Sequence, residues 1–306
     1  LIKKGYNVIA FDKYNSNNHW GWLEQSNFKH DCQVVLGDIR DYDSVSKAMK
    51  GCESVFHLAA LIGIPYSYVS PLAYIRTNVE GTYNILESAK NLELEQILIT
   101  STSETYGTAQ YVPITEEHPL VGQSPYSASK IGADHIAISY YKSFNMPIKI
   151  VRPFNTYGPR QSARAIIPTI ISQLMNNQNK ISLGSLSPTR DLTYVEDTCD
   201  GFYEIYSSNS LFGDATNIGM NSEISIKGLV ELISKEMNIE VEIEEKKERI
   251  RPKNSEVERL VCDNSKILNK TSWRPKFTLI EGIKKFIDWM ENPKNLKLYK
   301  FDQYNV

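Results

Sequence analysis

The first half of this chain alternates between short apolar stretches of strand length and longer stretches with helical periodicity. Such alternation is typical of a parallel β-sheet with helices on both faces, because parallel strands need a crossover connection. Strands are predicted at residues 8–11, 33–36, 54–58, 96–100 and 148–152. Helices are predicted between them at residues 44–49, 77–91 and 127–144. We therefore expect an α/β fold built on a parallel sheet.

The pattern becomes less regular after about residue 160. Helices are predicted there at residues 166–175, 227–237 and 279–292, and short strands at residues 181–183, 191–195 and 241–245. We expect a nucleotide-binding domain over residues 1–160. A smaller, mixed α/β lobe should occupy most of residues 161–306, with some segments returning to the first domain.

The start of the chain suggests that a preceding segment belongs to the fold. Residues 1–5 resemble the end of a helix capped by Gly5, and the strand that follows ends in Asp12. In a dinucleotide-binding fold, an acid after the second strand binds the adenosine ribose, and the glycine-rich phosphate loop lies about twenty residues upstream. We therefore expect the first strand and the glycine loop to lie upstream of Leu1.

Composition excludes several classes of function. The net charge of −2 gives no basic surface that would attract nucleic acid or an anionic membrane. No apolar run approaches the roughly 20 residues of a membrane span. The cysteines have no metal-ligand or disulfide spacing, so we expect free thiols, no metal site and a cytoplasmic protein. These cysteines are Cys32, Cys52, Cys199 and Cys262.

Tyr126 and Lys130 should share one face of a helix, because residues four positions apart are neighbours there. An ammonium near a phenol favours the phenolate and lowers its pKa. Tyr126 could then take a proton from a substrate hydroxyl near neutral pH, as a general base. Many helices carry this spacing by chance, so the interpretation depends on the surrounding residues.

A cluster of hydroxyl and carboxyl side chains follows the strand predicted at residues 96–100. Catalytic groups gather at such carboxyl ends of strands in open α/β sheets. A hydroxyl beside Tyr126 could bridge to a substrate hydroxyl, and a carboxylate adds a second acid–base group. The alternative is a polar loop with a capping threonine. The cluster consists of Thr102, Ser103 and Glu104.

Candidate cofactor ligands follow the other predicted strands, in addition to Asp12. Asp38 could meet an adenine amino group with Ile39 packing on the ring, although Asp38 could equally form an Asx turn. His57 is more simply a core histidine. Three residues after it would let a ligand approach the backbone closely: Leu58, Ala59 and Ala60.

Candidate phosphate ligands lie further along the chain. The planar guanidinium of arginine suits phosphate geometry, although any single arginine could equally be a surface charge. Asn155 can bind a substrate phosphate or carbonyl. The candidate substrate ligands are Asn155, Arg164, Arg190 and Arg251.

Together, these segments resemble the NAD-dependent nucleotide-sugar epimerases and dehydratases, a family of extended short-chain dehydrogenases/reductases. The resemblance covers nearly the whole chain. It implies a Rossmann-like, doubly wound parallel sheet, a smaller lobe that binds the nucleotide sugar, and tightly held NAD. It is carried by Asp12 and by residues 37–38, 57–60, 101–107, 126–130, 152–159 and 190–191.

The Thr-Ser-Glu triplet at residues 102–104 is similar to that of sugar-nucleotide 4,6-dehydratases, and UDP-glucuronate decarboxylases carry it too. Residues 14–23, 61–68 and 158–165 resemble the N-acetylglucosamine 4,6-dehydratases of the legionaminic-acid pathway. The resemblance therefore implies conversion of UDP- or GDP-N-acetylglucosamine to the 4-keto-6-deoxy sugar nucleotide, with internal hydride transfer from C4 to C6.

The same resemblance implies a role for each catalytic candidate. Tyr126, supported by Lys130, removes the C4 hydroxyl proton, while Thr102 holds the C4 oxygen. Glu104, helped by Ser103, abstracts the C5 proton and protonates the leaving C6 hydroxyl. The diphosphate would be bound by Asn155, Arg190 and Arg251.

Two other functions stay open at this point. The chain could be a UDP-sugar 4-epimerase or a UDP-glucuronate decarboxylase, or it could be a non-catalytic binding or regulatory remnant without the phosphate loop. The resemblance also implies a homodimer formed by the helices at residues 77–91 and 127–144. An apolar helix face could equally pack within one subunit.

Overall fold

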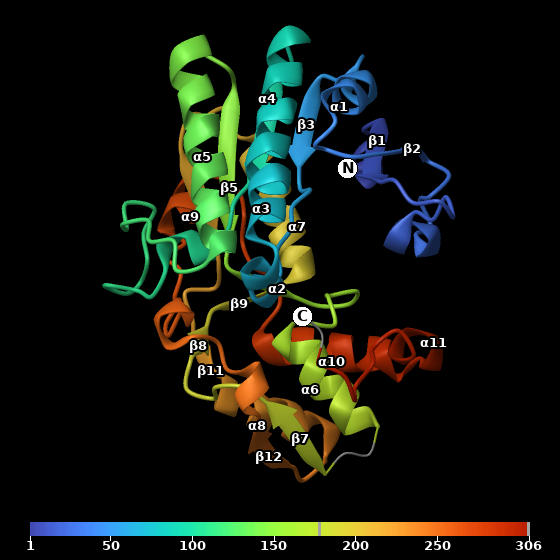
Figure 1. Ribbon diagram of the computed structural model, residues 1–306, viewed down its shortest axis with the longest axis vertical. Helices are drawn as coiled ribbons and strands as arrows, with labels where there is room; N and C mark the ends of the chain where they lie inside the picture. Colours follow the sequence, from blue (N-terminus) through green and yellow to red (C-terminus); the bar gives the residue numbers. More distant parts are fainter. Residues whose placement is uncertain (177–178, 305–306) are drawn as a thin grey trace.

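Two lobes make up the computed structural model, which describes residues 1–176 and 179–304 (Figure 1). The larger lobe contains a four-stranded parallel sheet with the strand order β10–β5–β4–β3 and a separate parallel pair, β1–β2. The bounds of these strands are β1 Val8–Lys13, β2 Cys32–Gly37, β3 Ser54–His57, β4 Gln96–Thr100, β5 Ile148–Pro153 and β10 Ala215–Ile218.

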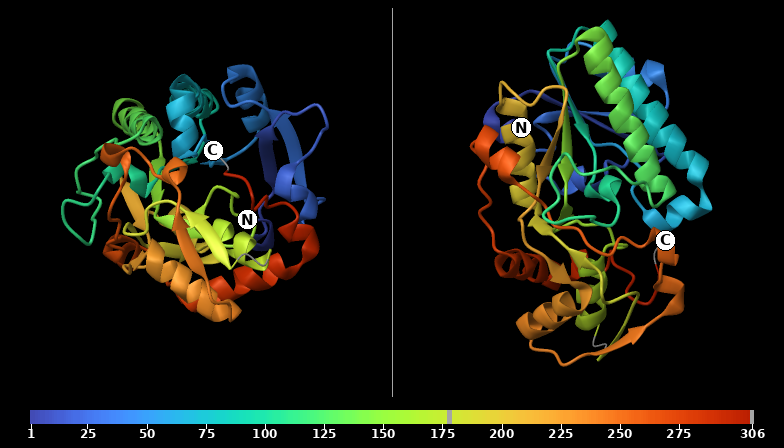
Figure 2. Two further views of the ribbon diagram at one scale, coloured as in Figure 1. Left: turned by 60° about the horizontal axis from the view of Figure 1, so that its bottom comes forward. Right: turned by 90° about the vertical axis from the view of Figure 1, so that its left-hand side faces the viewer.

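The central strands β4 and β5 are buried on both faces, which explains their almost continuous apolar sequences. Ile97 and Ile99 pack with the helices on one face, while Leu98 faces the opposite side and packs with Ile205. Side chains alternate between faces along a strand, so one apolar run serves two cores. Figure 2 shows the layers: α4 Gly81–Asn91 and α5 Pro125–Phe144 on one face, and α7 Val195–Ser207 on the other.

The pair β1–β2 lies beyond β3, on the side away from β4 (Figure 1). Val8 pairs with Cys32 and Lys13 with Gly37, so the two strands are in register along their whole length. Among the described residues, no strand ladder joins β1 to β3, so this pair is a separate sheet. Helix α1 Tyr42–Met49 follows β2.

Two helices position the site. The helical region predicted at residues 77–91 starts before residue 77. Helix α3 Pro71–Tyr74 and a π-helical segment, Ile75–Glu80, run directly into α4. Helix α5 begins with Pro125 in its first turn, where the missing amide hydrogen costs nothing. Ser124 and Ser127 form a reciprocal capping box that fixes the first turn of α5.

The smaller lobe packs three helices against short strand pairs. Ile170, Leu229, Ile233 and Phe286 are fully or almost fully buried where these helices meet. The helices are α6 Ile166–Met175, α8 Ile226–Met237 and α10 Leu279–Glu291. The strand pairs are β6 Asn155–Tyr157 with β9 Leu192–Tyr194, β7 Lys180–Leu183 with β12 Glu242–Glu245, and β8 Thr189–Arg190 with β11 Ile224–Ser225.

The sequence patterns did not predict α7 or β10, which both return from the second half of the chain to the large lobe. Helix α7 buries Asp197, Thr198 and Gly201 along with only one aliphatic residue, so no apolar stripe marks its inner face. Strand β10 is short and buries Thr216 and Asn217. Helix α9 Ser265–Lys270 and the buried Trp273 pack against the same face of the sheet as α7.

Candidate active site

Tyr126 and Lys130 occupy the first two turns of α5, beside the carboxyl end of β4. Both side chains are buried, with 7% and 3% of their surface exposed. The Lys130 ammonium donates a hydrogen bond to the Thr100 carbonyl at 2.6 Å. That bond fixes α5 against the end of β4 and so places Tyr126 next to Thr102.

The segment after β4 brings the predicted hydroxyl and carboxyl groups to the same place. Thr102 caps a 3₁₀ turn, Ser103–Tyr106, and its hydroxyl accepts a hydrogen bond from the Glu104 amide at 3.3 Å. Ser103 and Glu104 are buried, at 2% and 9% exposed. Thr102 therefore acts as a helix cap, and its hydroxyl lies close enough to Tyr126 to act on the pKa of that phenol.

The pKa of Tyr126 is raised above its ordinary value, chiefly because the phenol is buried. The hydrogen bond with Thr102 lowers this pKa, whereas the negative charge of Glu104 raises it. The expectation that Lys130 lowers the pKa of Tyr126 is therefore wrong for the protein without ligands. The Lys130 ammonium points to a carbonyl, and burial lowers its own pKa.

A buried ion pair lies behind the catalytic candidates. Asp134, one turn beyond Lys130, accepts hydrogen bonds from Arg152 at 2.9 Å and from Ser101 at 2.6 Å. Arg152 also donates to the Tyr106 hydroxyl at 3.1 Å. The charge of Asp134 acts to raise the pKa of Lys130, which favours the ammonium. Sequence reasoning missed Asp134, although its i+4 spacing from Lys130 was a usable signal.

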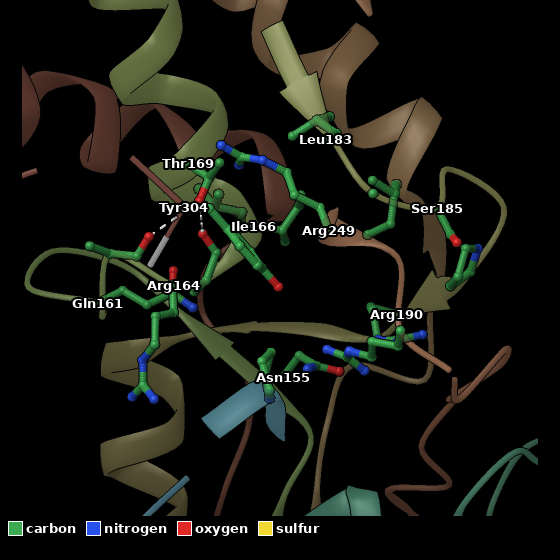
Figure 3. A pocket seen from close by; sticks show the side chains of 18 of the residues that line it. Asn155, Gln161, Arg164, Ile166, Thr169, Leu183, Ser185, Arg190, Arg249 and Tyr304 are labelled. Carbon is green, nitrogen blue, oxygen red and sulfur yellow. Dashed lines mark hydrogen bonds between the residues drawn. The ribbon is translucent and has the colours of Figure 1, made fainter. Parts of the chain in front are cut away.

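Glu104 lines a cavity of about 260 Å³ where the two lobes meet. Asn155 lines the same cavity (Figure 3). The same cavity is lined by three arginines that the sequence analysis selected separately: Arg164, Arg190 and Arg251. Glu104 connects this cavity to the catalytic candidates, because its charge acts on both Tyr126 and Arg190. The structure thus brings the predicted acid–base and phosphate-binding groups into one region.

Arg190 and Arg251 share a carboxylate that sequence reasoning missed. Each guanidinium donates to the same Glu256 oxygen at 3.2 Å. Arg190 also donates to the carbonyls of Thr189 at 2.8 Å and Val257 at 2.7 Å. These bonds hold the two guanidinium groups beside each other, in an arrangement suited to a diphosphate.

Arg164 is placed differently from the other two arginines. Its Nε donates to the Ser162 hydroxyl at 3.2 Å, and Figure 3 shows its guanidinium pointing away from Asn155 and Arg190. The guanidinium packs over Gly63, where an added Cβ would lie only 1.8 Å from Nη1. Gly63 precedes α2 Ile64–Val69 in the large lobe, so Arg164 bridges the two lobes.

Two buried side-chain acceptors belong to the cavity wall. Asn155 Oδ1 and Gln161 Oε1 have no hydrogen-bond partner among the described residues. Unpaired buried acceptors are costly, so both are suited to donors on a bound ligand. Sequence reasoning selected Asn155 but missed Gln161, as well as two further lining residues, Arg249 and Tyr304.

The cofactor candidates lie along the carboxyl ends of β1, β2 and β3. Asp12 is the penultimate residue of β1, and its Oδ1 accepts a hydrogen bond from the Lys13 amide, while its Oδ2 has no hydrogen-bond partner among the described residues. Leu58 is 63% exposed and Ala59 is also exposed, whereas Ala60 is partly buried. A free carboxylate oxygen and an open apolar segment fit the ribose and ring system of a dinucleotide.

Asp38 and Ile39 are less open than predicted. Asp38 is paired with Arg40 at 2.5 Å, and this pairing lowers its pKa. Ile39 is only 7% exposed and packs over Gly81 in the core, so little of its side chain is open to a bound ring. Asp38 and Arg40 line an open hollow of about 550 Å³ with Asp41, Arg76 and Glu80.

His57 is a core residue, as the simpler interpretation held. Its Nε2 lies 3.0 Å from the Thr82 hydroxyl, and burial lowers its pKa to about 3. Among residues 1–176 and 179–304, no group of three or more His, Cys, Asp or Glu side chains is arranged to hold a metal ion. The helices in these ranges also include none that is long and apolar enough to cross a membrane.

Comparison with known proteins gives the family. The GDP-mannose 4,6-dehydratase family model matches residues 1–286. A putative UDP-glucose 4-epimerase from Methanocaldococcus jannaschii is 32% identical over 298 residues, covering 95% of this chain and 93% of that protein. The dTDP-D-glucose 4,6-dehydratase of Homo sapiens is 31% identical over 299 residues, covering 95% of this chain and 85% of that protein.

A solved structure agrees with the fold. The dTDP-glucose 4,6-dehydratase from Bacillus anthracis strain Ames, in complex with NAD, is similar with a TM-score of 0.83 and 26% identity. The similarity covers 97% of this chain and 91% of that one. The resemblance predicted from the sequence motifs is therefore confirmed. This chain belongs to the GDP-mannose 4,6-dehydratase family, among the nucleotide-sugar dehydratases and epimerases of the extended short-chain dehydrogenase/reductase fold.

Proposed function

We propose that this protein is an NAD-dependent nucleotide-sugar 4,6-dehydratase that acts on UDP- or GDP-N-acetylglucosamine. The observation that carries the proposal is the position of Glu104. Its carboxylate is close enough to raise the pKa of Tyr126, and it lines the cavity that holds the paired arginines. A dehydratase needs a second acid–base group of this kind beside the tyrosine, whereas oxidation of the hydroxyl alone does not.

Asp12, Asp38 and the segment from Leu58 to Ala60 would hold the cofactor. The free Oδ2 of Asp12 would accept hydrogen bonds from ribose hydroxyls, and the exposed segment would lie against the dinucleotide. Bound NAD would accept a hydride from C4 and return it to C6, and the positive charge of its oxidised ring would favour the Tyr126 phenolate.

The chain's own residues move the protons. Tyr126 takes the proton of the C4 hydroxyl, while Thr102 binds the C4 oxygen. Lys130, whose charged form the carboxylate of Asp134 favours, donates to the Thr100 carbonyl and so holds Tyr126 beside Thr102. Glu104 takes the C5 proton and gives it to the departing C6 hydroxyl, so water leaves. As hydride returns to C6, C5 takes up a proton, and release of the proton held by Tyr126 balances this uptake.

The cavity supports the substrate assignment. Two segments that resemble the N-acetylglucosamine dehydratases contribute lining residues: Pro65 from one, and Gln161, Ala163 and Arg164 from the other. Arg190, Arg251 and Asn155 would bind the diphosphate. The unpaired Oε1 of Gln161 would accept a hydrogen bond from the sugar.

Mass spectrometry tests the proposal. The protein, with NAD added, would be incubated separately with UDP- and GDP-N-acetylglucosamine, UDP-glucose and UDP-glucuronate. We expect one of the N-acetylglucosamine substrates to lose one water and to become a ketone that borohydride reduces. Loss of carbon dioxide from UDP-glucuronate, or no mass change with any substrate, would reject the dehydratase assignment.

A 4-epimerase is the second candidate, favoured by the 32% identity to a putative UDP-glucose 4-epimerase. It would leave the substrate mass unchanged and alter chromatographic retention.

We also propose that the protein forms a homodimer through α3, the π-helical segment, α4 and α5. The continuous helical region from α3 to α4 carries three exposed apolar side chains. They are Leu72, Ile75 and Tyr83, with 56%, 53% and 45% of their surface exposed. Their spacing places them in one stripe on the helix. Such a stripe of apolar side chains suits the same surface of a second copy.

A further inference from the structure

The C-terminal segment returns to the substrate cavity after α11 Pro293–Leu296. Tyr299 is 5% exposed and its hydroxyl donates to the Gln161 carbonyl at 2.8 Å, which anchors the segment to a loop that lines the cavity. Gln303 and Tyr304 then line the cavity themselves. Both residues lie beyond residue 286, where the match to the family model ends.

The aromatic ring of Tyr304 lies beside the guanidinium group of Arg249. The Arg249 guanidinium lies 5.1 Å from the centre of the Tyr304 ring, and both residues line the cavity. The buried Nε of Arg249 has no hydrogen-bond partner in the part of the chain that the structure describes. A buried donor of this kind carries a free-energy cost that a ligand acceptor would remove.

Close packing fixes the backbone of Arg249. A Cβ added to Gly184 would lie 2.4 Å from the Arg249 carbonyl oxygen, so only glycine lets the two segments come this close. Gly184 directly follows β7, and it lines the same cavity. Arg249 is therefore held at one wall by the backbone of the smaller lobe.

The lining groups are separated along the cavity. Figure 3 shows Asn155 and Arg190 on one side, and Tyr304 with the Arg249 side chain, Thr169 and Leu183 on the other. A nucleotide sugar is a linear molecule in which the hexose and the base lie at opposite ends of the diphosphate. If the proposed function places the hexose beside Glu104, the base reaches the wall formed by Tyr304 and Arg249.

We propose that Tyr304 and Arg249 bind the nucleobase, an inference that rests on the proposed function for the direction of the substrate. The Tyr304 ring stacks on the planar base, and Arg249 Nε donates a hydrogen bond to a ring carbonyl. Uracil, thymine and guanine present such a carbonyl, whereas adenine does not. The C-terminal segment thus contributes to the choice of nucleotide.

Isothermal titration of the full chain with UDP, GDP, ADP and inorganic pyrophosphate tests the inference without requiring turnover. We expect Tyr304→Ala to weaken binding of the preferred nucleotide about tenfold, and Tyr304→Phe to preserve it, because stacking needs only the ring. Pyrophosphate should bind both variants as it binds the parent protein. Arg249→Leu should reduce the preference for that nucleotide over ADP.

Leu298→Ala is the matched control, since this side chain lies on the same segment, is 52% exposed and does not line the cavity. Equal weakening of nucleotide and pyrophosphate would overturn the inference. Unchanged or tighter nucleotide binding by Tyr304→Ala, or no binding of UDP and GDP by the parent, would overturn it as well. Nucleotide binding without dehydration would reject only the proposed function.

Discussion

At the scale of single residues, Glu104 stands between two kinds of chemistry. It is 9% exposed, its charge raises the pKa of Tyr126, and it favours the charged form of Arg190. A carboxylate shared in this way can take and give protons while the arginines bind the substrate. The acid–base roles of Glu104 and Tyr126 should therefore be separable by substitution.

Glu104→Gln keeps the shape of the side chain but removes its proton-accepting function. We expect steady turnover to fall about 10²- to 10⁴-fold, while substrate still reduces bound NAD. The measurement is the near-ultraviolet absorbance of reduced nicotinamide after mixing. Tyr126→Phe is the matched variant, and it should show neither reduction nor turnover. Product release by Glu104→Gln at the parental rate would contradict the role of Glu104.

Sequence reasoning found the residues that carry motif spacing and missed those defined only by tertiary contacts. Tyr126, Lys130 and Glu104 follow a recognisable strand–loop–helix order. Glu256 lies 66 positions from Arg190, and nothing in its neighbourhood marks it as the partner of two guanidinium groups. The pKa of Tyr126 was predicted in the wrong direction, because spacing on a helix does not reveal burial.

At the scale of elements, Lys149 in strand β5 caps the C-terminal end of helix α7, which packs on one face of the sheet. Lys149 is fully buried, and its ammonium donates to the carbonyls of Ile205 at 2.8 Å, Tyr206 at 3.0 Å and Ser208 at 2.5 Å. These carbonyls lie at the end of α7, where a helix leaves acceptors unpaired and favours positive charge. Strand β5 thus helps to terminate a helix that is contributed by the second half of the chain.

This contact predicts a pH dependence of stability. Burial lowers the pKa of Lys149 from 10.5 to about 8 in the folded protein. Between about pH 8 and pH 10.5, the unfolded chain binds a proton on Lys149 that the folded chain does not. The free energy of unfolding therefore increases as the pH rises through this range. Urea unfolding at about pH 7 and about pH 10 should show this gain in the parent protein and not in Lys149→Met.

Lys142→Met, an exposed position on α5, serves as the control and should behave like the parent. Equal changes in the parent and in Lys149→Met would show that Lys149 does not titrate in this range.

Elements with strong patterns were predicted within a few residues. Strand β4 and helix α6 match their predicted bounds, because each has a run of large aliphatic residues. Helix α7 and strand β10 were missed, because their buried faces include Asp197, Thr216 and Asn217. Asp197 and Asn217 are satisfied by distant partners, such as the Lys276 amide for Asp197 and the Ile114 carbonyl for Asn217. The Thr216 hydroxyl has no hydrogen-bond partner among the described residues.

At the scale of the whole molecule, the helices that carry the apolar stripe, α3, the π-helical segment and α4, lie on the face of the larger lobe away from α7 (Figure 2). A homodimer formed by this stripe would leave the cavity between the lobes accessible in each subunit. The stripe can therefore be disrupted without altering any residue that lines the cavity.

Sedimentation velocity tests the assembly. We expect the parent protein to sediment as a dimer and the double variant Leu72→Glu with Ile75→Glu as a monomer, because two buried carboxylates would face each other across the interface. Ile280→Glu is the control, since this residue is 44% exposed on α10 in the smaller lobe and should leave the dimer intact. A monomeric parent protein would reject the proposed interface.

Strand β10 is synthesised long after its partner β5, and this order affects how the sheet forms during translation. Strand β10, Ala215–Ile218, pairs with β5 and forms one edge of the four-stranded sheet. A ribosome must therefore have released about two thirds of the chain into solution before that edge can close. Until then, the apolar surface of β5 is open to chaperones and to other nascent chains. Cutting the gene between the lobes should yield two insoluble halves rather than two working modules.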